Sequence, residues 1–249
     1  MIKFSIITVT KNSEETIKDT LSSVSIQRYS NLEHIIKDGL SDDSTTNIVK
    51  SYLSNKISLI SKLDLGIYDA MNQGYEYSNG EVIAFLNSDD YYADDLVLED
   101  VAKVFSNNAI DYVYGNIVMV NKFGEKIRVW DMNSHQSTIA NMKQIAHPAL
   151  FIRRRCLGRL TACFDASYKI SADLKQQLIL LYKFNLTGEY IPRVIAVVKT
   201  GGESTKNLSS FLLGWRESIK AYNDVFISGG LLFTIKKVLT KLPHFFRKD

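Results

Sequence analysis

Short apolar runs rich in β-branched residues alternate with helical patterns along the first part of the chain, and no other feature constrains the fold as strongly. The predicted strands are residues 4–9 (FSIITV), 32–37 (LEHIIK), 57–61 and 82–86. The predicted helices are residues 14–25, 46–54, 67–77 and 96–105. Strands that alternate with helices in this way predict an α/β fold with a mostly parallel central sheet flanked by helices.

The remaining residues predict further strands and end in helices. A hairpin is expected from residues 112–121 and 127–130, and an apolar strand is expected after His147. One more strand is expected within residues 190–199. Helices are expected over residues 172–181, 208–225 and 231–242. The sequence contains no repeat and no linker that would separate two domains.

The composition is that of a globular protein. Of the 249 residues 45% are apolar and 23% are charged, and the net charge of +3 is too small to indicate nucleic-acid binding. Cys156 and Cys163 lack a Cys-x-x-Cys or His/Cys cluster, so we expect no zinc and two free thiols. The first residues do not resemble a signal peptide, and no window approaches the roughly 20 apolar residues of a membrane span. We therefore expect a cytoplasmic protein.

Polar clusters follow three of the predicted strands, at residues 8–12, 38–42 and 87–90. In a parallel sheet these clusters meet at one edge, where ligands bind. The last cluster belongs to FLNSDDYYADD, in which Asp89 and Asp90 come directly after an apolar strand. Neighbouring carboxylates repel each other unless a cation lies between them. The segment therefore predicts either a metal site or an acidic surface loop, and Asp94 and Asp95 are expected to cap the following helix.

Several segments together resemble one known family. They are FSIITVTKN, IIKDGLSDDST, DLGIYDAMNQG, GEVIAFLNSDD, AHPALFIRR, YKISADLKQQL and TGGEST, which cover most of positions 3–205. The chain resembles the family 2 glycosyltransferases with the GT-A fold, particularly bacterial enzymes of polysaccharide, O-antigen and colanic acid biosynthesis. The resemblance implies an inverting transfer of a sugar from a nucleoside diphosphate donor. It also implies a divalent cation, Mn²⁺ or Mg²⁺, held by a motif of the DxD type.

The resemblance assigns residues to the donor side. Asn87 stands at the first position of the metal motif, Asp89 is assigned to the metal and Asp90 to its support, although these two roles could be exchanged. Asp38 is expected to accept a hydrogen bond from the nucleobase, and a carboxylate suits the N–H of uracil, so we expect a UDP-sugar. The alternative for Asp38 is an Asp-Gly turn. The nucleotide-binding residues implied are Thr8, Val9, Thr10, Asn12, Asp38, Gly66, Asp69, Asn72, Asn87, Ser88 and Asp89.

The resemblance also assigns residues to the acceptor side. Asp173 is expected to be the general base that takes the proton from the attacking hydroxyl, the alternative being a helix cap. His147 and Arg153 are expected near the acceptor or the diphosphate, and either could instead be structural. The Gly-rich loop with Gly201, Gly202 and Ser204 is expected to offer backbone N–H groups to phosphate, unless it is only a flexible turn.

The resemblance divides the chain into parts. Residues 1–205 would form the GT-A catalytic domain, with a nucleotide-binding half over about 1–105 and an acceptor half over about 106–205. Residues 206–249 would form a C-terminal helical extension. Its basic and apolar segment GGLLFTIKKVLTKLPHFFRKD suits the surface of an anionic inner membrane, where a polyprenyl-linked acceptor would be found. The alternatives are an oligosaccharide acceptor and a helix that packs on the body with a solvated basic face.

Two other functions compete with this one. A sugar nucleotidyltransferase would need a Gly-rich loop after the first strand, and TVTKNSEET has none. A non-catalytic relative that binds a nucleotide or a glycan stays possible, because Asn87 replaces an acid of the metal motif. The sequence leaves open the donor sugar and base, the acceptor and linkage, and the oligomeric state.

Overall fold

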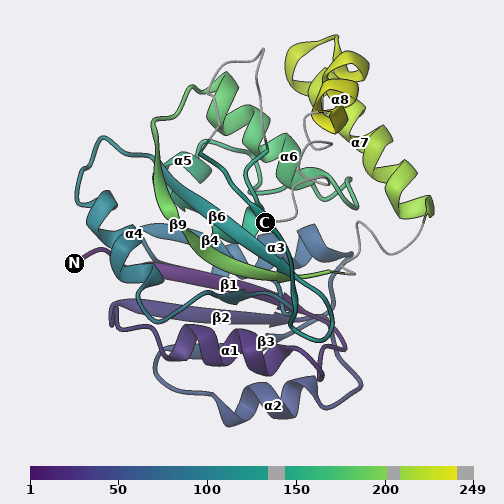
Figure 1. The fold of residues 1–249 in the computed structure, drawn as a ribbon. Helices are drawn as coiled ribbons and strands as arrows, with labels where there is room; N and C mark the ends of the chain where they lie inside the picture. The colour runs from purple at the N-terminus through teal and green to yellow at the C-terminus, as the bar shows by residue number, and fades with distance from the viewer. Residues whose placement is uncertain (134–143, 201–207, 240–249) are drawn as a thin grey trace.

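The computed structural model describes residues 1–133, 144–200 and 208–239, and within them one sheet of nine strands runs through the molecule (Figure 1). The strands are β1 (Phe4–Thr10), β2 (Leu32–Asp38), β3 (Ile57–Ser61), β4 (Val82–Phe85), β5 (Tyr91–Tyr92), β6 (Tyr112–Val120), β7 (Lys126–Trp130), β8 (Leu150–Arg153) and β9 (Gly188–Lys199). Their order is β3-β2-β1-β4-β8-β6-β9-β5, and β7 pairs with β6 outside this path.

The helices lie around this sheet. They are α1 (Ile17–Ser25), α2 (Thr45–Ser51), α3 (Ile67–Tyr77), α4 (Val97–Phe105), α5 (Arg154–Leu157), α6 (Ala172–Gln177), α7 (Leu208–Phe226) and α8 (Gly230–Leu239). The 3₁₀ turn η2 (His147–Ala149) precedes β8, and the π-helical segment η3 (Leu178–Lys183) continues α6.

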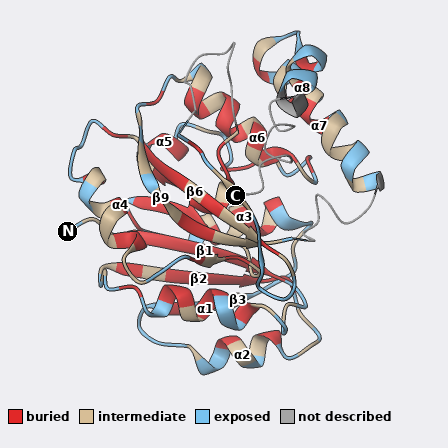
Figure 2. Ribbon diagram, viewed as in Figure 1, coloured by how far each residue is buried: buried red, intermediate tan, exposed pale blue. Residues whose placement is uncertain are grey.

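The first four strands form the parallel part that the sequence predicts. β1 pairs in parallel with β2 on one side and with β4 on the other, and β2 pairs in parallel with β3. Every residue of β1 is buried, as its uninterrupted apolar and β-branched pattern requires (Figure 2). Helix α3 packs on β1 and β2, and a small apolar cluster joins α1 and α2 to β2 and β3. The carboxyl ends of these strands therefore lie at one edge of the sheet.

Antiparallel strands attach the second half of the chain. β8 lies between β4 and β6 and is antiparallel to both, while β9 runs parallel to β6. The carboxyl-terminal part of β9 pairs with the short strand β5, with Tyr91 opposite Val197 and Tyr92 opposite Ala196. Because β5 directly follows the acidic turn, this pairing brings the end of β9 next to Asp89 and Asp90. The sheet is thus mixed: β1 to β4 form one parallel part, β6 and β9 form a second parallel pair, and antiparallel β8 joins the two.

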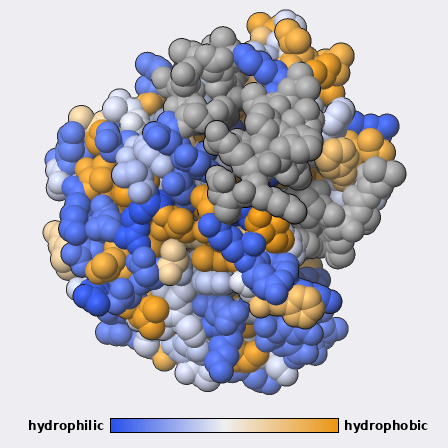
Figure 3. All heavy atoms as spheres, viewed as in Figure 1, coloured by the Kyte–Doolittle hydropathy of each residue, from blue (hydrophilic) through white to orange (hydrophobic). Residues whose placement is uncertain are grey.

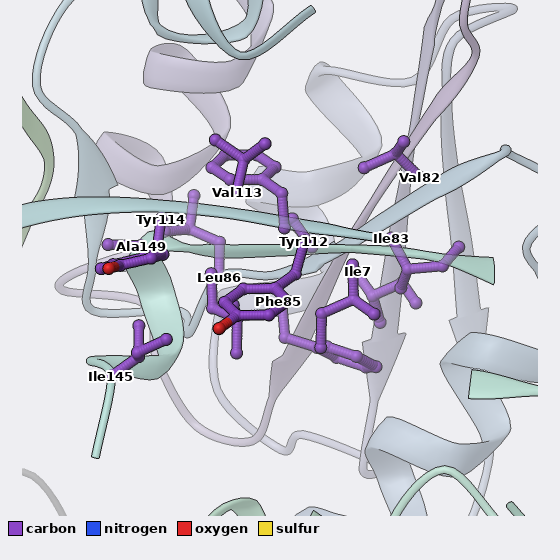
Figure 4. Close-up of a cluster of buried hydrophobic side chains, with 14 of the residues drawn as sticks. Ile7, Val82, Ile83, Phe85, Leu86, Tyr112, Val113, Tyr114, Ile145 and Ala149 are labelled. Carbon is purple, nitrogen blue, oxygen red and sulfur yellow. The ribbon is translucent and has the colours of Figure 1, made fainter. Parts of the chain in front are cut away.

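The main core lies along the middle of the sheet. Figure 4 shows side chains of β1, β4 and β6 packed against Ile145 and Ala149, and all of them are buried. The packing joins residues from both halves of the chain, so the two halves share one core. This continuity agrees with the lack of a linker in the sequence.

The two C-terminal helices pack on the body. Helix α7 contacts α6 and η3, and α8 packs on α7, at the upper right of Figure 1. In the part of the chain that the structure describes, no helix combines the length and the apolar character needed to cross a bilayer. Residues 240–249, which carry Lys241, Arg247 and Lys248, lie outside the described residues.

His34 in β2 gives the fold a pH dependence. Its side chain is fully buried, and its Nε2 shares a hydrogen bond of 2.9 Å with Thr8 Oγ1. Burial lowers the pKa of His34 from 6.5 to about 3. As the pH falls below 6.5, the pKa of His34 in the unfolded chain, the imidazole becomes protonated in the unfolded state but stays neutral in the folded state. The free energy of unfolding should therefore fall by up to about 1.4 kcal/mol per pH unit.

We expect His34→Gln to remove this contribution. Its free energy of unfolding, measured by urea titration, should fall less steeply than that of the wild type as the pH drops from about 6 to about 4. Measurements near pH 8, where the imidazole is neutral in both states, report the direct cost of the substitution and serve as the control. Parallel pH profiles for the two proteins would contradict the assignment.

Candidate active site

One cleft of about 1080 Å³ opens at the carboxyl ends of β1 and β4, where parallel sheets bind ligands. Its walls come from residues 9–16 after β1, from the start of α3, from the acidic turn 87–90, from the approach to α6 and from the end of β9. A volume of this size is sufficient for a ligand as large as a sugar nucleotide. The three polar clusters meet at one edge of the sheet, as predicted: the loop after β2 bonds to the one after β1 through Asn12 and Ser41 at 2.8 Å. Two of the clusters, 8–12 and 87–90, contribute residues to the cleft, and the cluster 38–42 does not.

The acidic turn holds Asp90 in a buried position. Asn87 Nδ2 donates a hydrogen bond of 2.9 Å to Asp90 Oδ2, and Thr20 Oγ1 donates one of 2.7 Å to the main-chain carbonyl of Asp90. Asp90 Oδ1 has no hydrogen-bond partner within the described residues. Burial, and secondly the charge of Asp89, raise the pKa of Asp90 well above its usual value. The turn therefore orders Asp90 at an electrostatic cost.

Asp89 is only partly buried and lines the cleft. Burial raises the pKa of Asp89, and the positive charge of Lys199 opposes that shift. A divalent cation at this turn would favour the charged form of both acids. The oxygens available to it include Asp90 Oδ1 and Asn87 Oδ1, which are buried and without partners in the described part of the chain. Oxygen atoms of this kind are the ligands that Mg²⁺ and Mn²⁺ prefer, so the residues fit such a cation.

The protein alone supplies few ligands here. In residues 1–133, 144–200 and 208–239 no group of three or more His, Cys, Asp or Glu side chains could hold a metal ion. A cation at Asp89 would therefore need oxygens of the substrate or of water, which is usual for Mg²⁺.

Lys199 is a cleft residue that the sequence did not reveal. It is the last residue of β9, and its Nζ forms an ion pair of 2.7 Å with Asp19 Oδ2. Its charge opposes the upward pKa shifts of Asp89 and Asp90. In the sequence Lys199 only ends an apolar run. Its place beside the acidic turn results from the pairing of β5 with β9.

Asp173 also lines the cleft, on the wall that α6 contributes. Gln144 Nε2 donates a hydrogen bond of 2.7 Å to Asp173 Oδ2, and Tyr68 Oη donates one of 3.3 Å to Asp173 Oδ1. The phenol has a single proton, which it shares with the nearer Ile170 carbonyl at 2.6 Å. Burial and the Asp173 charge raise the pKa of Tyr68 well above its usual value, so the phenol stays a donor. Tyr68 and Gln144 were not predicted as site residues, because their partners are remote in the sequence.

His147 lines the same cleft between aromatic rings. Its imidazole stacks on Phe85 at 5.3 Å between ring centroids and meets the edge of Phe164 at 5.5 Å. Burial lowers the pKa of His147, while the charge of Asp173 opposes that shift. The imidazole is therefore favoured in its neutral form within the cleft.

Asp38 does not reach the cleft. Its buried carboxylate accepts hydrogen bonds from Ser41 Oγ at 2.5 Å and from Ser61 Oγ at 2.6 Å. Asp64 lines the cleft instead, and the buried Lys37 Nζ lies 2.8 Å from Asp64 Oδ2. Contact of Asp38 with the nucleobase stays a prediction.

The start of α3 contributes a different set of residues than expected. Gly66 lines the cleft, and its φ of 130° lies in a region that favours glycine. Asp69 Oδ2 accepts hydrogen bonds from the Leu65 N–H and Gln73 Nε2, both at 2.9 Å. Asn72 exchanges two hydrogen bonds of 2.8 Å with the main chain of Phe164. Neither Asp69 nor Asn72 lines the cleft, and the contacts of Asn72 join α3 to the second half of the chain.

The other predicted residues divide between cleft, scaffold and undescribed chain. Those that line the cleft are Val9, Thr10, Asn12, Asn87 and Ser88. Thr8 is buried against His34. Arg153 is also buried, and it donates to the carbonyls of Ile110 at 2.8 Å and Phe105 at 2.7 Å, so its position gives no support to phosphate binding. Gly201, Gly202 and Ser204 lie outside the described residues.

Known proteins with similar sequences are glycosyltransferases. The family model described as Glycosyl transferase family 2 matches residues 5–168. A PGL/p-HBAD biosynthesis glycosyltransferase of Mycobacterium tuberculosis is 28% identical over 174 residues, or 68% of this chain and 66% of that protein. The UDP-Glc:alpha-D-GlcNAc-diphosphoundecaprenol beta-1,3-glucosyltransferase WfgD of Escherichia coli is 34% identical over 118 residues, or 47% of this chain and 46% of that protein. The chain thus matches less than two thirds of the length of either relative.

Solved structures share the fold. The S. aureus TarS 1–349 structure in complex with UDP-GlcNAc has a TM-score of 0.66 and 20% identity, covering 98% of this chain and 73% of that one. The mannosyltransferase PcManGT from Pyrobaculum calidifontis, in complex with GDP-Man and Mn²⁺, has a TM-score of 0.65 and 14% identity, covering 97% of this chain and 75% of that one. The GT-A fold predicted from the sequence is confirmed.

The contacts of Asn72 lead to a test of its role. Asn72→Ala leaves the N–H and C=O of Phe164 unpaired, so the free energy of unfolding should fall by about 1–3 kcal/mol. Urea unfolding measures this change, and Glu76→Ala at an exposed position of α3 is the control. Nucleotide affinity, measured by calorimetry, should stay at the wild-type value. Weakened nucleotide binding with unchanged stability would instead support the donor contact predicted from the sequence.

Proposed function

The chain belongs to glycosyltransferase family 2, and we propose that it transfers a sugar from a UDP-sugar to a lipid-linked or growing glycan, with inversion at the anomeric carbon. The observation that carries this proposal is the cleft itself, which has a desolvated pair of acids on one wall and Asp173 on another. Two comparisons support the choice of substrates. The E. coli relative is named for transfer from UDP-Glc to a diphosphoundecaprenol-linked sugar, and TarS was solved with UDP-GlcNAc.

The donor would lie along the carboxyl ends of β1 and β4. Val9, Thr10 and Gly66 offer a close approach to the backbone there, and Asp64 is the carboxylate that lines this part of the cleft. In this proposal Asp64, held by the buried ammonium of Lys37, is available for polar groups of the nucleoside. Asp38 would act indirectly: its hydrogen bond with Ser41 orders the loop that follows β2.

The acidic turn would bind the diphosphate end of the donor. Asp89 is the proposed direct ligand of Mn²⁺ or Mg²⁺, because it is the more exposed of the two acids that line the cleft, while Asp90 is buried and has one oxygen bonded to Asn87. When bound, such a cation stabilises the negative charge that develops on the departing diphosphate. Lys199 places a second positive charge at the same end of the cleft, available to the phosphate oxygens.

Asp173 would perform the proton transfer. As the acceptor oxygen forms its bond to the anomeric carbon and the bond to the diphosphate breaks, a carboxylate oxygen of Asp173 takes the hydroxyl proton. Gln144 and Tyr68 hold the two oxygens of this carboxylate, which sets its orientation before the acceptor arrives. The neutral His147 is placed to contact the acceptor or the donor sugar, since it lines the same cleft.

The exposed apolar side chains of α7 and α8 support a peripheral contact with the cytoplasmic face of a membrane. Leu231 and Leu232 are 61% and 74% exposed, and Phe211 and Leu212 are also exposed. Figure 3 shows apolar side chains gathered at the upper right, over these helices. Lys236 is exposed on α8, as a surface that meets anionic lipid requires. A lipid-linked acceptor would be reached from such a position.

Nucleotide and metal binding are testable together. We expect UDP with Mn²⁺ to raise the Tm of the wild type more than UDP alone, because binding to the folded state stabilises it. In Asp89→Ala the part of this shift that depends on Mn²⁺ should be lost. GDP with Mn²⁺ is the matched control, and a clear GDP response without a UDP response would contradict the proposed donor.

Catalysis is tested separately at Asp173. Asp173→Asn keeps the size of the side chain but removes the base, so we expect the release of UDP from UDP-glucose and UDP-N-acetylglucosamine to slow by about 10²–10⁴-fold. The UDP-dependent Tm shift should persist in this variant. A wild type that binds UDP but never turns a donor over would favour the alternative that Asn87 suggests, a non-catalytic relative.

A further inference from the structure

One side chain of α7 organises the approach to α6. The Glu217 carboxylate accepts three main-chain hydrogen bonds, from the N–H groups of Lys169 at 2.8 Å, Ile170 at 2.8 Å and Ser171 at 2.9 Å. Glu217 is only 8% exposed. Hydrogen bonds between a carboxylate and N–H groups are stronger than those between neutral groups, and three of them define one conformation of the peptide chain. The segment 169–171 therefore depends on Glu217 for its shape.

This segment connects directly to the proposed base. Lys169 and Ile170 line the cleft, and Asp173 follows Ser171 by two residues. The Ile170 peptide is held on both sides, because its N–H donates to Glu217 while its carbonyl accepts the hydrogen bond of Tyr68 Oη. The same Tyr68 hydroxyl shares its single proton with Asp173 Oδ1, which lies 3.3 Å away. A change in the conformation of residues 169–171 would therefore displace both the backbone that leads to Asp173 and the Tyr68 hydroxyl that contacts it.

A second contact from α7 acts on the far side of the segment. Asp224 Oδ2 accepts hydrogen bonds from Tyr168 Oη at 2.7 Å and from Lys175 Nζ at 2.8 Å. Unlike Asp224, Glu217 binds the backbone of residues that line the cleft.

We propose that Glu217 is a positioning residue for Asp173, so that α7 completes the active site. This inference rests on the proposed function, in which Asp173 is the base. It gives α7 a role beyond a membrane contact. The helix lies outside the segment matched by the family model, which ends at residue 168.

The test compares Glu217→Gln with the wild type. The amide keeps the size of the side chain but has one acceptor oxygen, and its NH₂ group faces main-chain donors. We expect kcat for UDP release from UDP-glucose or UDP-N-acetylglucosamine with Mn²⁺ to fall on the order of 10- to 100-fold, the effect of a displaced catalytic group. The KM for the donor and the UDP affinity should stay unchanged. Hydrogen exchange should show lost protection at the amides of residues 169–171.

Control variants separate positioning from general stability. Arg216→Gln, at an exposed position of the same helix, should leave kcat and amide protection at wild-type values. Glu217→Ala should lower kcat further than Glu217→Gln. If the alanine variant does not fold, the glutamine variant decides alone. A lower Tm with unchanged kcat in Glu217→Gln would mean a purely structural role and would overturn the inference.

The remaining outcomes are also decisive. Unchanged amide protection in Glu217→Gln would show that the carboxylate does not hold this segment, and would overturn the inference while leaving the proposed function intact. A wild type that releases no UDP from either donor would overturn the proposed function, and the inference with it. Wild-type turnover together with a slower Glu217→Gln variant and lost protection at residues 169–171 would support both.

Discussion

The site depends on two neighbouring carboxylates at the end of a buried strand, of which Asp90 is buried and Asp89 is partly buried. β4 directs Asp89 and Asp90 to the edge of the sheet, and the hydrogen bonds of Asn87 and Thr20 keep Asp90 there. Burial raises the pKa of both acids, and each charge opposes ionisation of the other. An arrangement of this kind is unfavourable unless positive charge arrives. Lys199 supplies positive charge, and the proposed divalent cation would supply more.

The second half of the chain converts this acidic edge into a cleft. Antiparallel pairing of β8 with β4 attaches it, and pairing of β9 with β5 brings Lys199 to the acids. Contacts between remote residues then order the opposite wall, including the two hydrogen bonds between Asn72 and Phe164 and the ring stacking of His147 on Phe85. Asn72, which the sequence predicts as a ligand contact, here joins α3 to the second half of the chain, and its contact with the donor stays a prediction.

The C-terminal helices have features of both alternatives that the sequence presents. Their packing on α6 and η3 agrees with a helix that covers the body, and their exposed apolar residues agree with a surface that meets lipid. The three backbone hydrogen bonds of Glu217 connect this part of the chain to the segment before Asp173. In the proposed function, the region nearest the membrane would thus also orient the base that acts on the acceptor.

The sequence by itself determined the order and type of most elements, the family, and the acidic turn after β4. These follow from local pattern, because buried parallel strands need continuous apolar runs and helices need apolar residues at helical spacing. It could not reveal β5, which has only two residues, or that β8 lies antiparallel between β4 and β6. Only the tertiary structure decided that Asp38 and Arg153 have hydrogen-bond partners within the scaffold, that Lys199 and Tyr68 line the cleft, and that Gln144 contacts Asp173 while Glu217 contacts residues 169–171. The physical reason is that hydrogen bonds and charges act over a few ångströms in space, and their partners here are separated by long stretches of chain.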